Sequence, residues 1–237
     1  MRNKIFGLSV LILIVSSCSV LKTNQTSKGF YDTGELKNDY SIENGTREGI
    51  SKEYYKNGDV KFEWNYVGGK LNGITKEYHA DDEISEWKYS SDTLINGKTY
   101  FKSGKLRANY NYKNGQRDGE SFRYYETGEI DTKWMYKKGN LIDGNGYYDT
   151  GELKYKFKYE NGVSEGITIE YFKSGNISRE LKYKDGLLKG ITKQFNESGI
   201  LTYEWNYDNG KLDGTTIEYY ENGKIKNKWI YENDNLK

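Results

Sequence analysis

The chain has 237 residues, and its composition excludes most kinds of active site before any motif is considered. Tyr numbers 24 and Gly 27, whereas Pro is 0, His is 1 and Cys is 1. A single His and a single Cys rule out an internal disulfide and a Cys/His metal cluster, and they leave one imidazole for nucleophilic catalysis. Lys and Arg total 36 against 35 acidic residues, so there is no electrostatic footprint of a nucleic-acid binder. We therefore expect no enzyme, no resident cofactor or metal, and no nucleic-acid partner.

The first segment, residues 1–17, is expected to be a signal peptide. Arg2 and Lys4 precede an apolar run over 5–15, which has the length of a secretory signal core and is shorter than the roughly 20 residues that span a bilayer. The run ends in the sequence VSSC, which resembles the bacterial lipobox. We therefore expect Cys18 to become the lipid-bearing first residue of the mature protein. A plain signal peptide followed by a free Cys is the alternative.

Residues 18–29 are expected to be the lipidated Cys and a polar tether, because the sequence after Cys18 shows no apolar period. Acyl chains on that Cys would hold the protein to a membrane. Ser19 follows the Cys where an inner-membrane retention signal usually has Asp, so resemblance to known lipoproteins favours the outer membrane. The sequence leaves the side of that membrane open.

From residue 30 to 237 the chain repeats one unit nine times. The starts of the units are spaced 24, 24, 22, 24, 23, 24, 24 and 24 residues apart, which is typical of a repeat array. The starts are Phe30, Tyr54, Tyr78, Tyr100, Tyr124, Tyr147, Tyr171, Phe195 and Tyr219.

Glycines at fixed positions predict two turns, and hence two short strands, in each unit. The fifth position is Gly in every unit except that beginning at Tyr78, which has Asp82. A second Gly follows about eleven residues later in most units, often after Asn, and Asn-Gly supplies the positive φ angles of a tight hairpin turn. The unit from Tyr78 lacks this second Gly as well, in the segment SSDTLING. We therefore expect a distorted or looser turn there.

The residues between the turns alternate, as in a strand with two different faces. In the second unit one side is expected to carry Val60, Phe62, Trp64 and Tyr66, and the other Lys61, Glu63 and Asn65. All five Trp residues fall in one column of the repeat. The members of this column proposed as a candidate binding face are Trp64, Trp87, Tyr110, Trp134, Phe157, Trp205 and Trp229.

The unit YYxNGxxKxExxYxxGKxxG resembles the variant MORN repeat, a β-hairpin module. The resemblance covers Phe30 to about Tyr231. It implies an all-β fold, an elongated, twisted, single-layer antiparallel sheet of tandem hairpins. It further implies roles in scaffolding, membrane association or protein binding, and some bacterial members carry an antitoxin label.

The aromatic columns admit two interpretations. They are either the thin core of the sheet itself, or a strip left partly uncovered by a one-layer fold and used for binding. His79 is interpreted as a substitute aromatic at a hairpin end, because the sequence offers it no catalytic partners. The many acidic residues are interpreted as a solvated face.

Three functions remain from the sequence. The first is a non-enzymatic, envelope-anchored scaffold that binds a protein partner. The second is a carbohydrate- or cell-wall-binding lipoprotein, because Tyr and Trp also stack on sugar rings. The third is an antitoxin or immunity partner of a toxin, which rests only on the family label.

Overall fold

The computed structural model describes residues 24–237, and the fold in this part of the chain is the expected one. Every regular element between residues 24 and 237 is a β-strand, and every pairing between strands is antiparallel. The all-β expectation is therefore confirmed. The expected signal peptide, Cys18 and the first part of the tether lie outside the described residues.

The sheet contains eighteen longer strands and seven strands of two residues. The longer strands are β1 (Asn24–Phe30), β2 (Leu36–Glu43), β4 (Gly49–Tyr54), β5 (Val60–Val67), β7 (Gly73–Tyr78), β8 (Ile84–Ser90), β9 (Thr93–Tyr100), β10 (Leu106–Lys113), β12 (Gly119–Tyr124), β13 (Ile130–Lys137), β14 (Asn140–Tyr147), β15 (Leu153–Glu160), β17 (Gly166–Tyr171), β18 (Ile177–Lys184), β20 (Gly190–Phe195), β21 (Leu201–Asp208), β23 (Gly214–Tyr219) and β24 (Ile225–Glu232). The short ones are β3 (Thr46–Arg47), β6 (Lys70–Leu71), β11 (Gln116–Arg117), β16 (Val163–Ser164), β19 (Leu187–Leu188), β22 (Lys211–Leu212) and β25 (Asn235–Leu236).

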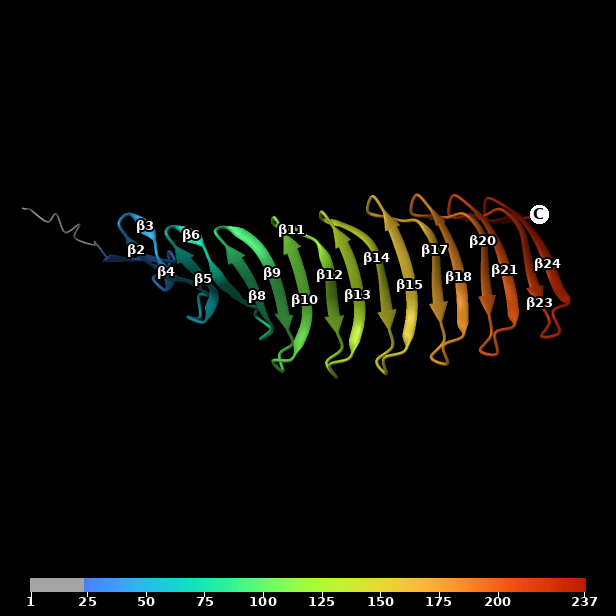
Figure 1. The fold of residues 1–237 in the computed structure, drawn as a ribbon, viewed down its shortest axis with the longest axis horizontal. Helices are drawn as coiled ribbons and strands as arrows, with labels where there is room; N and C mark the ends of the chain where they lie inside the picture. Colours follow the sequence, from blue (N-terminus) through green and yellow to red (C-terminus); the bar gives the residue numbers. More distant parts are fainter. Residues whose placement is uncertain (1–23) are drawn as a thin grey trace, which may run out of the picture.

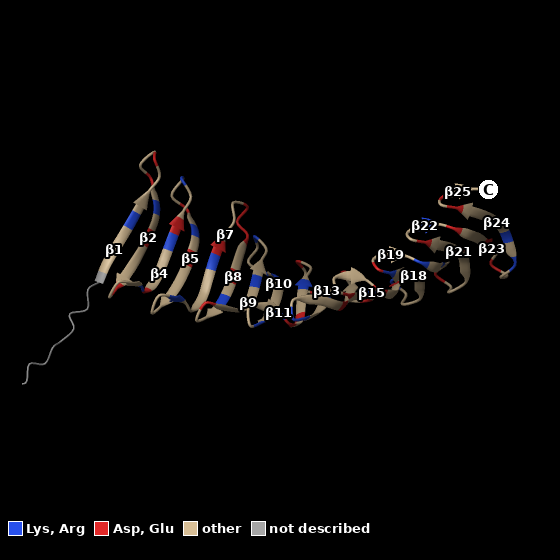
Figure 2. Cartoon of the chain, turned by 90° about the horizontal axis from the view of Figure 1, so that it is seen from above, with Lys and Arg blue, Asp and Glu red and all other residues tan. Residues whose placement is uncertain are grey.

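The longer strands lie side by side in chain order, so each hairpin follows the previous one along a single ribbon (Figure 1). Each short strand pairs with the end of the preceding long strand, as β6 does with β5. The ribbon is one layer thick and twisted, and no other element covers either face of the described sheet (Figures 1 and 2). Figure 2 also shows Lys and Arg interspersed with Asp and Glu along the array, which keeps both signs of charge mixed.

Two kinds of turn alternate along the ribbon, and both use positive φ angles. In the turn after β4 the amide of Gly58 donates to the carbonyl of Tyr55 at 3.0 Å, and Gly58 has a φ of 92°. The turn between β5 and β6 has two successive positive φ angles, 57° at Gly68 and 79° at Gly69, as in a type I′ hairpin.

The unit that begins at Tyr78 keeps both turns without glycine, so the expectation of a distorted or looser turn was wrong. Ser91 and Asp92 have φ angles of 47° and 66°, and Asp82 has 65°. The strands on either side of Ser91 and Asp92 stay in register, with Ser90 opposite Thr93. Asp tolerates the left-handed region better than most residues, and the ladder on both sides of a two-residue turn holds the backbone in this conformation.

Bulges explain why the period varies. In the unit from Tyr54, Lys61 is an extra residue beside the first turn, and Asn72 and Gly73 are two extra residues beyond the second. The unit from Tyr78 has no bulge at its first turn and one extra residue, Ile95, after its second, which shortens it by two. The unit from Tyr124 loses only one, because Ile142 stands alone at its second bulge. Spacings of 24, 22 and 23 residues follow directly.

The second half of the expected tether is a strand instead. Residues 24–29 belong to β1, which pairs with β2 from Asn24 opposite Glu43 to Phe30 opposite Leu36. This segment has no apolar alternation because β1 is an outer strand with mostly exposed side chains. Its backbone hydrogen bonds to β2 form whatever those side chains are.

Neighbouring units are joined by hydrogen bonds at both long edges of the ribbon. The hydroxyl of Tyr55 donates to the carbonyl of Tyr78, 23 residues further on, at 2.8 Å. At the opposite edge the amide of Gly69 donates to the carbonyl of Arg47 at 3.0 Å. The same two contacts recur in other units, so each hairpin is fixed to the next, as expected when each repeat mainly contacts its neighbours.

Candidate binding face

The Trp column and its flanking aromatic columns lie on one face of the sheet, here called the aromatic face. Phe62 and Trp64 of β5 stack at 5.2 Å between ring centroids, and Tyr203 and Trp205 of β21 repeat that arrangement at the same distance. Lys61 was expected on the other side. As a bulge residue it lies with the rings instead, and its ammonium is 5.3 Å from the centroid of Phe62.

Each Trp ring packs beside a small hydroxylated residue of the preceding strand. The pairs in direct register are Ser51 with Trp64, Thr75 with Trp87, Ser121 with Trp134, Thr192 with Trp205, and Thr216 with Trp229. All five Ser and Thr residues are at most 5% exposed, while the Trp rings are half-buried. Ala108 is the one apolar residue between 24 and 237 that is fully buried. The rings thus form the thin core with one side and remain open to solvent with the other, so both interpretations of the columns hold in part.

Two arginines fill gaps between the aromatic columns. The guanidinium of Arg47 lies 4.6 Å from the ring of Tyr40 and donates to the hydroxyl of Tyr66 at 3.2 Å. Arg117 lies 4.4 Å from the ring of Tyr110 and donates to Tyr136 at 3.0 Å. Cation–π contacts and hydrogen bonds therefore fix these side chains on the aromatic face.

Three tyrosines of the column that contains Tyr66 have a raised pKa. Burial raises the pKa of Tyr89, of Tyr183 and of Tyr207 above the usual value. Their neutral hydroxyls provide hydrogen-bond donors beside the aromatic rings, and this combination suits an interface.

The opposite face is a lattice of ion pairs with apolar side chains between them. Lys52 pairs with Glu63 at 2.8 Å, and the hydroxyl of Tyr78 also donates to Glu63, at 3.2 Å. Ile50 and Ile74 stand exposed beside these groups, at 58% and 48%. This face is solvated, as expected for the acidic residues. The exposed isoleucines were not predicted, because they stand next to Ser or Thr in the repeat and do not form a clear apolar pattern in the sequence.

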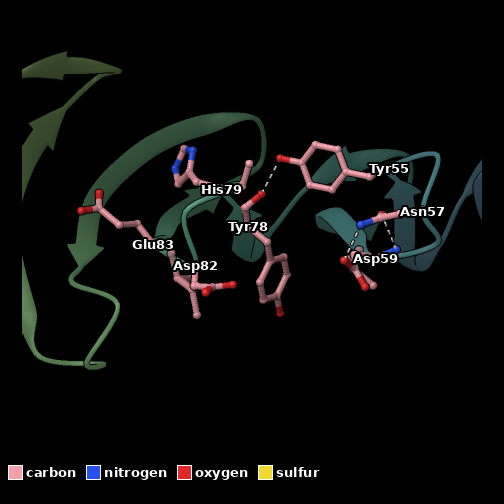
Figure 3. Close-up of a pocket in the computed structure, with 10 residues that line it drawn as sticks. Tyr55, Asn57, Asp59, Tyr78, His79, Asp82 and Glu83 are labelled. Atoms are coloured by element: carbon pink, nitrogen blue, oxygen red, sulfur yellow. Dashed lines mark hydrogen bonds between the residues drawn. The ribbon is translucent and has the colours of Figure 1, made fainter.

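A cavity of about 650 Å³ lies between two first turns, and His79 is among the residues that line it (Figure 3). Its polar groups do not converge on one point. Asn57 and Asp59 bond to each other within their own turn, at 2.7 Å, and the ring of Tyr78 is directed away from His79. Glu83 is engaged by Arg107. The cavity therefore holds no set of groups aimed at a common substrate atom.

His79 does have partners, which the sequence did not reveal, but they do not form a catalytic arrangement. Its Nε2 lies 3.0 Å from Oγ of Ser85, and its Nδ1 lies 3.9 Å from Glu77. The second distance is too long for a hydrogen bond. Ser85 is 5% exposed and does not line the cavity, and it lies in a strand that is paired on both sides, so its amide is not free to stabilise an oxyanion.

No group of three or more His, Cys, Asp or Glu side chains within residues 24–237 could hold a metal ion. No helix among the described residues is long and apolar enough to cross a membrane.

The structure places all seven candidate residues of the Trp column on the aromatic face, each half-buried. The row of Ser, Thr and Gly residues beside them was missed, although it could have been found from the position two residues after the third glycine of most units. Also missed was a recess over β14, which depends on glycines that look like turn residues in the sequence.

Five segments match the family model described as MORN repeat variant, at residues 47–67, 117–138, 164–185, 188–209 and 212–236. No curated protein matches the chain. Among solved structures, the chain is similar to a crystal structure of TcdB2-TccC3-Cdc42, with 16% identity and a TM-score of 0.19 over 89% of this chain and 14% of that one. It is also similar to a porin-like protein from Bacteroides uniformis ATCC 8492, with 9% identity and a TM-score of 0.19 over 89% of this chain and 98% of that one.

Proposed function

Because the matched segments make this chain a MORN-repeat protein, we propose that it is a non-enzymatic scaffold that binds a protein partner along the aromatic face. The observation that carries the proposal is the row of half-buried Tyr and Trp rings that no other element of the described sheet covers. Contiguous apolar surface of this kind marks interaction sites, and Tyr, Trp and Arg are the residues that contribute most to them.

The array also suits a long partner. Its hairpins repeat two aromatic columns, that of Trp64 and that of Tyr66, so the partner would meet similar rings at regular intervals. Phe62 and Tyr203 each add a further ring, stacked on the Trp of the same strand. Hydrogen bonds between units hold these rings in place before binding. A preordered surface loses less conformational freedom on association.

Site-specific photo-cross-linking in cells tests this. A photo-reactive residue at Trp205 is expected to capture a discrete protein, identified by mass spectrometry. The same residue at Asn206, the next position of β21 and on the opposite face, is the matched control and is expected to capture much less. No captured protein at Trp205, Trp134 or Trp64, or equal capture at Asn206, would contradict the proposal.

We further propose that the scaffold is held to the bacterial envelope by lipid on Cys18, with the outer membrane favoured. The support is the sequence alone: the short basic segment, the apolar run and the VSSC motif. Palmitate labelling that is lost in Cys18→Ser, and processing that globomycin blocks, are the expected results. Unlabelled wild-type protein would refute the anchor and would leave the binding face untouched.

A further inference from the structure

The aromatic face has a recess of about 350 Å³ near its middle, over β14, with a lining unlike the rest of the array. Its walls include the rings of Trp134, Tyr155, Phe157 and Tyr183, and the side chains of Ser164 and Thr168. The volume is at the lower end of the range of small-molecule sites.

Two glycines on β14, Gly144 and Gly146, let the rings of Phe157 and Tyr155 lie close against that strand. At the position of Gly144 most other units have Ser or Thr. At the position of Gly146 the other units have Thr or a longer side chain. Neither has a positive φ, so no turn requires them. Three ring carbons of Tyr155 lie at nearly equal distances over the position of a Gly146 Cβ, too close for any side chain, so this ring lies with its face against the strand.

Ser164 opens one wall. It is the second residue of a two-residue strand, a position that elsewhere holds Leu or Arg, as in Leu71, Leu188 and Leu212. It stands in register with Tyr159. Where Leu or Arg would fill the space beside that ring, Ser leaves room and adds a hydroxyl.

The rings at the recess do not stack on each other as they do elsewhere. Tyr155 and Phe157 are inclined at 35°, and Phe157 meets Tyr159 edge-on at 82°. In the second and eighth units the corresponding pairs are nearly parallel, at 13° and 6°, so each ring there covers its neighbour. The recess therefore presents ring surfaces at an angle to one another, which suits a puckered ring better than a flat one.

The polar groups select a neutral, hydroxylated ligand. Arg123 is already paired with Asp131 and donates to Thr132 at 3.3 Å, so it adds no uncompensated charge. No carboxylate lines the recess, which disfavours a cation. An apolar side chain of a protein would strip water from the hydroxyls of Ser164 and Thr168 without replacing its hydrogen bonds, at a cost.

We propose that this recess is a subsite for one neutral sugar ring of an oligosaccharide, stacked on the Tyr155 and Phe157 rings and hydrogen-bonded through the hydroxyls of Ser164 and Thr168. The subsite lies within the aromatic face and shares Trp134 and Phe157 with the protein interface proposed above, but it does not depend on a protein partner. It requires only that a single pyranose unit reach the centre of the aromatic face.

Ligand-observed NMR and calorimetry on the full chain, kept in a detergent without a sugar headgroup, test the proposal. The probes are methyl glucoside, methyl galactoside, N-acetylglucosamine and its dimer at millimolar concentration. At least one is expected to bind the wild type. Ser164→Leu restores the residue common at this position and is expected to weaken that binding by about tenfold or more, which corresponds to about 1.4 kcal/mol. Leu212→Ser, at the same position of another unit, is the control and is expected to bind as the wild type does.

Phe157→Leu gives an independent variant, because Leu181 occupies this column in the next unit. It removes the stacking ring and is expected to lose binding as well, and circular-dichroism melts of all variants verify folding. The proposal is overturned if no probe binds the folded wild type, or if both Ser164→Leu and Phe157→Leu bind a probe as the wild type does. A captured protein whose binding is lost in Ser164→Leu, with no sugar bound, would assign the recess to a protein side chain instead.

Discussion

Replacement of Thr192 by Val removes a buried hydroxyl that has no protein partner. Thr192 is 5% exposed beside Trp205, and its Oγ1 has no hydrogen-bond partner among the protein groups. Leaving such a group buried costs about 1–3 kcal/mol. Val has nearly the same shape and an equal preference for strands, so the substitution is expected to stabilise the fold by about 1 kcal/mol, or about 2–4 °C in Tm for a chain of this size.

Thr132→Val is the matched control. Thr132 is 2% exposed on the same face, but its Oγ1 accepts a hydrogen bond from Arg123 at 3.3 Å. Its loss is expected to destabilise the protein by about 1 kcal/mol. Thermal melts followed by circular dichroism compare the two variants. If Thr192→Val melts below the wild type, or if both substitutions shift Tm equally, the partnerless hydroxyl is not a source of instability and the reasoning is refuted.

Three further predictions concern a turn, a hydrogen bond between neighbouring units, and the dependence of stability on pH. Asp82→Gly should raise the unfolding free energy by up to about 1 kcal/mol, since Asp82 has a φ of 65° where every other unit has Gly; a lower Tm would contradict this. Tyr148→Phe removes the 2.8 Å hydrogen bond to the carbonyl of Tyr171 and should lower the unfolding free energy by about 0.5–1.5 kcal/mol in chemical denaturation. An unchanged midpoint would show that this hydrogen bond between units contributes nothing to stability. Burial, and then the hydrogen bond to Glu86, raise the pKa of Tyr100 to about 12. The contribution of neutral Tyr100 to stability is therefore complete below about pH 10 and is lost as the pH rises towards about 12. Tyr100→Phe should reduce the loss of stability between about pH 10 and 12, and an unaltered pH profile would refute the assignment.

The sequence was sufficient to predict the fold and the faces, because both depend on local rules that every unit repeats. Gly after Asn predicts a type I′ turn, and alternation places Phe62, Trp64 and Tyr66 together. Lys61 and Val60 could not be placed by alternation, because the bulge at Lys61 interrupts it. Lys61 lies with the rings, and Val60 stands in register with Tyr54 on the opposite face. The strand at 24–29 could not be predicted either, since its pairing with β2 depends on backbone groups that leave no pattern in the side chains.

The candidate site shows the same division. The Trp column is readable because one residue type recurs at one spacing. The hydroxyl row beside it alternates among Ser, Thr and Gly, and only strand register identifies it as one feature. The turn at Ser91 and Asp92 was misjudged because residue preference alone was considered, whereas the flanking ladder determines the backbone conformation.

The variation in the length of the units also relates to the differences between units along the aromatic face. A full unit places a positive-φ glycine such as Gly73 at its second bulge, and a Ser or Thr two residues later beside the Trp column. When the bulge loses one residue, as at Ile142, that glycine is no longer needed in the bulge, and Gly144 instead stands in the strand beside Trp134. The aromatic ring of the next strand then settles over bare backbone rather than beside a side chain. The unit from Tyr78 has the same shortened bulge, at Ile95, and a glycine, Gly97, beside Trp87. The shortened bulge is therefore not sufficient for a recess, and the one over β14 also depends on Gly146 and Ser164.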